Sequence, residues 1–279
     1  MKWKKGLVIV AAITMLMTGC SNTSGSEVQS SESQTEKNNE VVIYFARHGK
    51  TMLNTVDRSQ GWIDAPLTPA GVEVAEALGK GLSDVEFNKA YSSDSGRAIE
   101  TAELILANNG QDDLEVTKDK RLREYNFGTY EGMLNEEMMA AVAEKKGLSV
   151  EEYMKFMQEN GFYKSIKEFA DILSELDKAN VEEGVNWPAE DSKTIETRLQ
   201  ESLNDIVEEA KEDGGGNILV VSHGMSIVTL LGDLDENIEV PASGLSNASI
   251  SKVTYKEGKY TVDSVNDLSY VEKGQKQKN

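Results

Sequence analysis

The stretch Val41–Asn54, VVIYFARHGKTMLN, constrains the fold of this chain more than any other. It opens with a continuous apolar and largely β-branched run, which is typical of a strand buried on both faces in a parallel sheet. The run ends abruptly at Arg47 and His48. Because ligands of open α/β sheets bind just beyond the carboxyl ends of strands, the pattern predicts a ligand site there. An imidazole beside a guanidinium suggests a nucleophile or general base with a phosphate-sized anion in reach.

The two histidines of the chain share one sequence context. His48 lies in FARHG and His223 lies in VVSHG, so each follows a hydrophobic strand pattern and precedes a glycine. An Arg-His pair after one strand would ordinarily be a detail of a loop. Finding both histidines of the chain in this position by chance is improbable, and we therefore interpret both as functional residues.

The N-terminus has the features of an export signal. Three lysines near Met1 precede a short apolar segment, Gly6–Met17, which is shorter than the roughly 20 apolar residues of a transmembrane helix. Residues 17–20, MTGC, resemble a bacterial lipobox, although Met17 stands where leucine is usual. The resemblance implies a signal peptide over residues 1–20, lipid modification of Cys20, and a lipoprotein anchored to the outer face of the cell membrane. An ordinary cleaved signal or an uncleaved anchor is the alternative.

The remaining composition divides the chain into a tether and a domain. Residues 21–40 are polar and nearly free of apolar side chains, so we expect a disordered tether. Residues 41–279 are enough for one sizeable α/β domain. Cys20 is the only cysteine, so no internal disulfide supports this domain. The net charge of −19 disfavours binding to nucleic acid.

Further candidate residues lie between the two histidine strands. Arg97 falls in the first turn of a predicted helix and can point back toward the sheet edge, although a solvated helix arginine is the alternative. Glu124 belongs to a loop, residues 121–132, that mixes charges, aromatic residues and glycine without a period. Its carboxyl group suits a general acid, although composition alone favours a structural role. Residues 135–187 are predicted to form a helical insertion, whose apolar side chains favour a local core over a ligand box.

Four motifs in this order resemble the histidine phosphatase superfamily, also called the phosphoglycerate mutase-like family: RHGKTMLN, SSDSGRAIETA, LREYNFGTYEG and VVSHG. The resemblance extends from Val41 to about Tyr270. It implies a three-layer α/β/α sandwich with a mainly parallel central sheet and with the helical insertion lying over the active site.

The resemblance also implies a role for each candidate residue. His48 is the nucleophile that becomes phosphohistidine. Arg47, Arg97 and a protonated His223 bind the transferred phosphoryl group, and Asn54 is a further phosphate contact. Glu124 is the acid that protonates the leaving oxygen. No cofactor or metal is implied, because the cations of the protein take the place of a metal ion.

These expectations favour a phosphatase that hydrolyses phosphorylated small molecules. FGTYEG, residues 127–132, resembles the phosphatase branch, and phosphoglycerate metabolism belongs in the cytoplasm, whereas this chain carries an export signal. A mutase that returns the phosphoryl group to a bound substrate is the first alternative, and a non-catalytic surface binding lipoprotein is the second. Lys50 stands where related chains often carry Glu or Gln, and its charge would favour polyanionic substrates.

Overall fold

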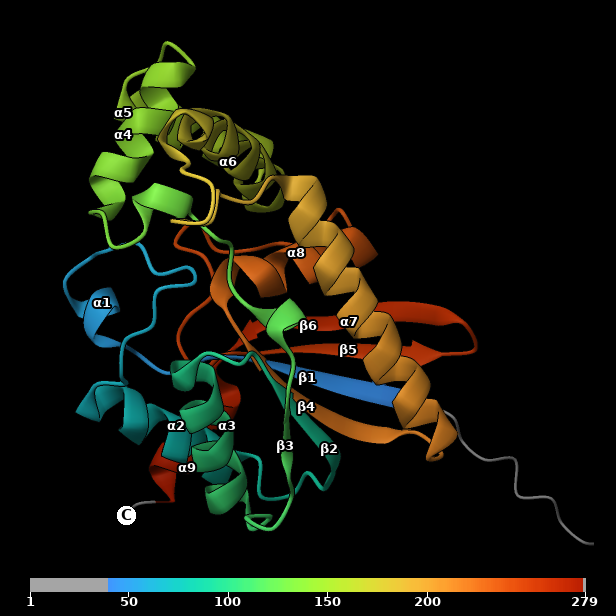
Figure 1. Cartoon of the computed structure of the whole chain (residues 1–279). Coiled ribbons are helices and arrows are strands. Elements are labelled where there is room, and N and C mark those ends of the chain that lie inside the picture. The colour runs from blue at the N-terminus through green and yellow to red at the C-terminus, as the bar shows by residue number, and fades with distance from the viewer. Residues whose placement is uncertain (1–39, 278–279) are drawn as a thin grey trace, which may run out of the picture. The chain divides into compact units, whose positions relative to one another are not determined.

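Strand β1 (Val41–Arg47) lies inside a six-stranded sheet in the computed structural model, which describes residues 40–277 (Figure 1). The predicted signal peptide with Cys20, and the tether as far as residue 39, lie outside the described residues. Within residues 40–277, no helix is both long enough and apolar enough to cross a membrane.

The sheet is mainly parallel, with the order β3-β2-β4-β1-β5-β6. The strands that join β1 are β2 (Phe87–Ser92), β3 (Val116–Lys118), β4 (Gly216–Ser222), β5 (Ile250–Lys256) and β6 (Lys259–Asp267). The first four strands in this order pair in parallel, and β5 and β6 complete the sheet as an antiparallel hairpin. Gly216 is the first residue of β4.

Helices cover both faces of the sheet, as predicted. Successive residues of β1 point to opposite faces: Ile43 and Phe45 join one buried core, and Tyr44 and Ala46 join another. The first core contains residues of α7 (Ser192–Glu212) and α8 (Gly224–Leu234). The second contains residues of α2 (Pro69–Gly81), α3 (Gly96–Asn109) and α9 (Ser269–Lys276) (Figure 1). The chain therefore folds as the expected three-layer α/β/α sandwich.

Three helices fall within the predicted insertion: α4 (Asn135–Lys145), α5 (Val150–Asn160) and α6 (Phe162–Asp177), at the top of Figure 1. The 3-10 turns η1 (Lys120–Leu122), η2 (Gly128–Tyr130) and η3 (Lys178–Asn180), and the short helix α1 (Met52–Thr55), complete the elements. The apolar residues of the insertion pack as core, as predicted, but this core is not local to the insertion. Tyr153, Ile166 and Phe169 belong to the same buried cluster as Phe45, so the insertion and the sheet share one core.

Helix α9 continues to Lys276, although the residues from Lys273 onward are polar. It packs closely on α2 through two glycines. A Cβ at Gly274 would lie 1.8 Å from Ala77 O, and a Cβ at Gly81 would lie 1.8 Å from Tyr270 O. Close packing of α9 on α2 therefore accounts for a helix that continues to Lys276 despite the polar composition of these residues.

We therefore expect Gly274→Ala to lower the free energy of unfolding by about 1–3 kcal/mol, because the added methyl group forces the two helices apart. Urea denaturation followed by circular dichroism measures this change. Gln275→Ala on the exposed side of the same helix is the control, and it should change stability by less than about 0.5 kcal/mol. Equal stability of the two variants would contradict the close packing.

Candidate active site

The two histidines meet at the carboxyl ends of adjacent parallel strands. Arg47, the last residue of β1, is the register partner of Ser222, the last residue of β4. His48 and His223 follow these two residues, and their ring centroids are 5.2 Å apart. The shared register of β1 and β4 therefore places both imidazoles at one edge of the sheet, as their sequence context suggested.

His48 is held as a neutral imidazole. Its side chain is buried, and Nδ1 lies 2.7 Å from the carbonyl oxygen of Gly49. Since a carbonyl only accepts hydrogen bonds, Nδ1 carries the proton and Nε2 keeps its lone pair. Burial lowers the pKa of His48 well below its ordinary value of 6.5, and the charges of Arg97 and Arg47 lower it further. A neutral imidazole with a free Nε2 can act as a nucleophile.

Gly49, the residue after His48, is required by close packing. Its φ is not positive. A Cβ at this position would lie 2.7 Å from Gly71 O, so glycine allows α2 to pack against the loop that follows His48. The amide of Gly49 also donates to Thr101 Oγ1 at 3.0 Å, which ties the loop to α3.

His223 is oriented by Arg97. Nη2 of Arg97 lies 2.9 Å from Nδ1 of His223, and because the guanidinium only donates, Nδ1 accepts and Nε2 carries the proton. This Nε2 is buried and has no hydrogen-bond partner. Burial, followed by the charge of Arg97, lowers the pKa of His223 well below 6.5. The expectation of a protonated His223 is therefore wrong for the protein alone, in which the neutral imidazole offers one N–H donor.

Arg97 is a buried residue, not a solvated helix arginine; only 1% of it is exposed. Its Nη1 donates to Ile63 O and to Asp64 Oδ1, both at 3.0 Å, and its Nη2 donates to Gly61 O at 2.8 Å. The loop before α2 thus fixes the guanidinium with backbone carbonyls and one carboxylate. Burial lowers the pKa of Arg97 from its ordinary value, with Asp64 opposing the change. The Nε atom is left without a partner.

Arg47 is held by the segment before β5. Its Nη1 donates to the carbonyl oxygen of Leu245, and its buried Nε has no partner. A Cβ at Gly224, the residue after His223, would lie 3.4 Å from this Nε. Arg47, Arg97 and His223 therefore present three buried, unpartnered N–H donors around His48, and an anion with several oxygens is the ligand that such a set suits.

Glu124 lies at the N-terminus of α8. Oε1 accepts hydrogen bonds from Tyr125 N, Ser226 N and Ser226 Oγ at 2.9–3.1 Å, and Oε2 accepts from Met225 N at 3.0 Å. The carboxylate is thus fixed in one orientation, with three hydrogen bonds on Oε1 and one on Oε2. Its charge acts on both Arg47 and Arg97. Glu124 therefore lies close enough to the two arginines for its charge to raise the pKa of each.

Asn54 and Asn247 complete the loop side of the site. Asn54 Oδ1 accepts from Thr51 N at 3.2 Å, which caps α1. Asn247 Nδ2 donates to the backbone oxygen of His48 at 3.0 Å, and it lies 3.5 Å from Asn54 Oδ1. All six residues proposed from the sequence thus lie around the same strand ends, whereas Asn247 was missed because its segment has no motif.

Glu131 was also missed, although it lies in the FGTYEG motif. Its carboxylate accepts hydrogen bonds from the backbone amides of Gly61, Trp62, Ile63 and Phe127, at 2.7–3.2 Å. It therefore holds the loop whose carbonyls bind Arg97.

Arg198 on α7 holds the backbone at Glu124. It donates to the carbonyl oxygen of Glu124 at 2.9 Å and pairs with Glu190. Within residues 40–277, no cluster of three His, Cys, Asp or Glu side chains is arranged to hold a metal ion.

The model of the histidine phosphatase superfamily (branch 1) matches residues 43–171 and 157–268. These stretches cover most of the chain, so the protein belongs to this superfamily of enzymes.

Individual relatives carry both mutase and phosphatase names. The probable phosphoglycerate mutase GpmB of Yersinia pestis (strain Pestoides F) is 28% identical over 241 residues, covering 82% of this chain and 94% of that protein. The crystal structure of phosphoglycerate mutase from Bacillus anthracis str. Sterne is 46% identical, with a TM-score of 0.76 over 86% of this chain and 98% of that one. A mycobacterial glucosyl-3-phosphoglycerate phosphatase shares the fold, with a TM-score of 0.59 and 21% identity over 82% of this chain and 99% of that one.

The lowered pKa values of the histidines give a direct test of the site. We expect neither imidazole to titrate near pH 6.5 in the folded protein, because burial and the neighbouring arginines disfavour the charged form. The chain has two histidines, so a proton–carbon NMR titration should follow one imidazole signal from each.

The urea-unfolded chain is the control, and both signals should titrate near pH 6.5 there. Because the unfolded chain takes up these protons first, the free energy of unfolding should also fall as the pH drops below about 6.5. A folded-state midpoint at or above 6.5 for either signal would show that the imidazoles are not held neutral.

Proposed function

We propose that the protein is a phosphatase that hydrolyses phosphomonoesters through a phosphohistidine intermediate and that needs no metal ion. The observation that carries the proposal is that Arg47, Arg97 and His223 each keep one buried, unpartnered N–H donor, that His223 lies beside the neutral His48, and that the charges of both arginines act on His48. A tetrahedral phosphoryl group has the oxygens to accept from all three, and His48 Nε2 has the lone pair to attack its phosphorus.

The first step transfers the phosphoryl group to His48. Nε2 attacks the phosphorus in line, a phosphorus–nitrogen bond forms, and the bond to the ester oxygen breaks. The two arginines and the Nε2–H of His223 stabilise the charge on the phosphoryl oxygens. Glu124, which takes up a proton before this step, gives that proton to the departing oxygen, so that the alcohol leaves neutral.

The second step returns the enzyme to its first state. The Glu124 carboxylate takes a proton from water while the water oxygen attacks phosphorus, and the phosphorus–nitrogen bond breaks. Free phosphate leaves and Glu124 is protonated again. The net reaction consumes one phosphomonoester and one water, and it yields one alcohol and one phosphate.

Phosphoglycerate mutase activity is the second candidate, and the names of the Yersinia and Bacillus relatives favour it. A mutase must also hold the carboxylate of phosphoglycerate, which calls for cations beyond those on the phosphoryl group. Arg123 and Arg198, in and beside the Glu124 loop, are instead paired with Asp94 and Glu190. This pairing supports hydrolysis. A non-catalytic binding lipoprotein would have no use for an acid beside the nucleophile.

We expect purified wild-type protein, without its first 20 residues, to release phosphate from 4-nitrophenyl phosphate in the presence of a chelator. His48→Ala should reduce release to background. Glu124→Gln should release about one 4-nitrophenolate per enzyme in a burst and then turn over about 10²–10⁴-fold more slowly, because the nitrophenolate leaves without a proton whereas the attacking water still needs a base.

Stopped-flow absorbance measures the burst, and acid-labile phosphate on the protein identifies the phosphohistidine. Phosphoryl exchange between 2- and 3-phosphoglycerate without phosphate release would instead favour the mutase. No reaction in either assay would leave the binding lipoprotein as the better account.

We also propose that the mature protein is exported and held at the outer face of the cell membrane by lipid on Cys20. The basic start, the short apolar segment and the MTGC junction support this proposal. These residues lie outside the described part of the chain.

In a bacterial host, the wild-type protein should fractionate with membranes and incorporate labelled fatty acid. Cys20→Ser should lose the label, and because Cys20 is the only cysteine, no other thiol can replace it. Unlabelled wild-type protein in the cytosolic fraction would rule out the anchor.

A further inference from the structure

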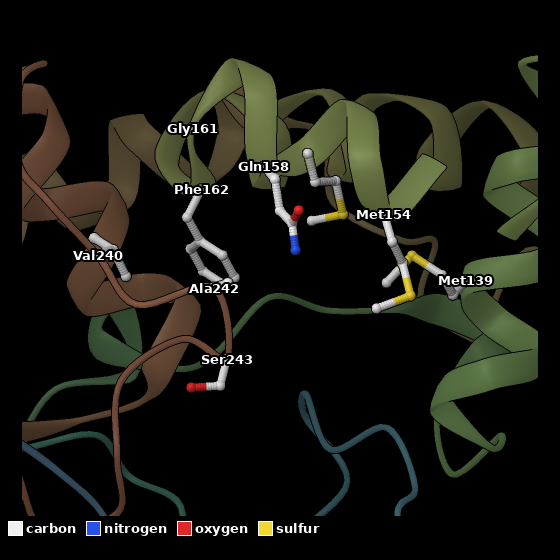
Figure 2. Close-up of a pocket in the computed structure, with 9 residues that line it drawn as sticks. Met139, Met154, Gln158, Gly161, Phe162, Val240, Ala242 and Ser243 are labelled. Carbon is white, nitrogen blue, oxygen red and sulfur yellow. The ribbon is translucent and has the colours of Figure 1, made fainter. Parts of the chain in front are cut away.

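A methionine-rich pocket lies between the helices of the insertion and the segment that precedes β5 (Figure 2). Its volume is about 320 Å³, which is within the range of small-molecule sites. Helices α4, α5 and α6 provide most of the lining, and the chain between α8 and β5 provides the rest. The lining residues are Met139, Met154, Met157, Gln158, Gly161, Phe162, Val240, Ala242 and Ser243.

The pocket is joined to the phosphoryl-binding groups through one short segment. Ser243 lines the pocket, and Leu245, two residues further on, accepts the hydrogen bond from Arg47. Two residues of extended chain span no more than about 7 Å. Phe162 packs on the glycine between them, since a Cβ at Gly244 would lie 3.3 Å from its Cζ. The segment that accepts the hydrogen bond from Arg47 therefore also forms part of the pocket wall.

The chemistry of the lining selects against charged groups. None of the described residues that line the pocket carries a charge, and the only polar side chains are those of Gln158 and Ser243. An unpaired carboxylate or second phosphate would lose its hydration there without gaining a counter-charge. Lys50, the cation that we expected to favour polyanionic substrates, is exposed and does not line this pocket.

The same lining suits an apolar group. Methionine side chains are flexible and polarisable and adapt to irregular apolar shapes. Met154 remains 54% exposed, so it has apolar surface that a ligand can cover. A cavity of about 150 Å³ accommodates benzene, so this pocket has room for roughly two fused rings or a comparable alkyl chain.

We propose that this pocket binds the alcohol portion of the substrate, and that the substrate is the phosphomonoester of an uncharged, apolar alcohol or phenol. The inference rests on the proposed phosphatase function. The phosphoryl group occupies the site at His48, the ester oxygen faces Glu124, and the apolar group lies against Met154, Met157 and Phe162.

The test uses ethyl, butyl and hexyl phosphate, whose alcohols leave with similar intrinsic ease. For the wild-type protein we expect kcat/KM to rise by up to about four-fold for each added methylene, and by about ten-fold or more from ethyl to hexyl. The matching alkylphosphonates, which have no ester bond to hydrolyse, should show the same order of affinity in calorimetric titrations.

Three variants test whether the pocket causes the rise of kcat/KM with alkyl chain length. Met154→Glu places a charge in the pocket and should bring the hexyl-to-ethyl ratio close to one, whereas the volume-conserving Met154→Leu should keep it. Val185→Glu is the matched control, because Val185 is 75% exposed in the same insertion and does not line the pocket. It should keep the wild-type ratio.

Two results would overturn the inference: a flat series for the wild-type protein, or a ratio that survives in Met154→Glu. The phosphonates separate this failure from failure of the proposed function. A gradient in phosphonate affinity without turnover of any ester would support the pocket and count against hydrolysis. Turnover of all three esters at equal kcat/KM, with equal phosphonate affinities, would support hydrolysis and remove the pocket from substrate selection.

Discussion

The hydrogen bond from Arg97 Nη2 to His223 Nδ1 is the contact on which the rest of the site depends. It fixes the tautomer of His223, and so it determines that Nε2 is a donor. It requires a guanidinium that is almost completely buried, and a buried charge is costly unless its donors are satisfied. The carbonyls of Gly61 and Ile63 satisfy them, and Glu131 holds those carbonyls in place through the amides of the same loop. A loop with no catalytic side chain thereby determines the protonation pattern of a histidine on another strand.

The charged groups around this contact are arranged in a way that suits phosphoryl transfer. The helix N-termini near the site are already used by carboxylates of the protein: Glu124 accepts from the first amides of α8, and Asp64 accepts from Gly96 at the start of α3. The proposed anion site therefore consists of the side chains of Arg47, Arg97 and His223 and not of helix amides. Burial keeps His48 neutral, and the charges of the same two arginines lower its pKa further, so the groups proposed to recognise the anion also favour the neutral imidazole.

The sequence predicted those parts of the fold and site that are encoded locally. Buried strands end sharply in polar residues, so the places of Arg47, His48 and His223 could be read from β1 and β4 alone. Parts that depend on contacts between distant residues were not predictable in this way. Asn247 reaches His48 from a segment without a motif, Gly49 is needed because α2 packs against it, and Gly274 orders a terminus whose composition suggests fraying. The prediction of a charged His223 was wrong for the same reason. Its burial and its proximity to Arg97 become visible only in three dimensions.

The shared core joins the helices that line the methionine-rich pocket to the strand that precedes His48. Tyr153, Ile166 and Phe169 of the insertion pack in the same cluster as Phe45 of β1, three residues before His48, the proposed nucleophile. Movement of the insertion would therefore disturb the strand that positions His48. Phe162 on Gly244 and Leu245 on Arg47 give a second connection, at the mouth of the site. The two sites differ in chemistry: buried cations surround His48, whereas methionines line the pocket. An ester with a charged phosphate and an apolar alcohol matches both sites at once, whereas a uniformly charged substrate matches only the first.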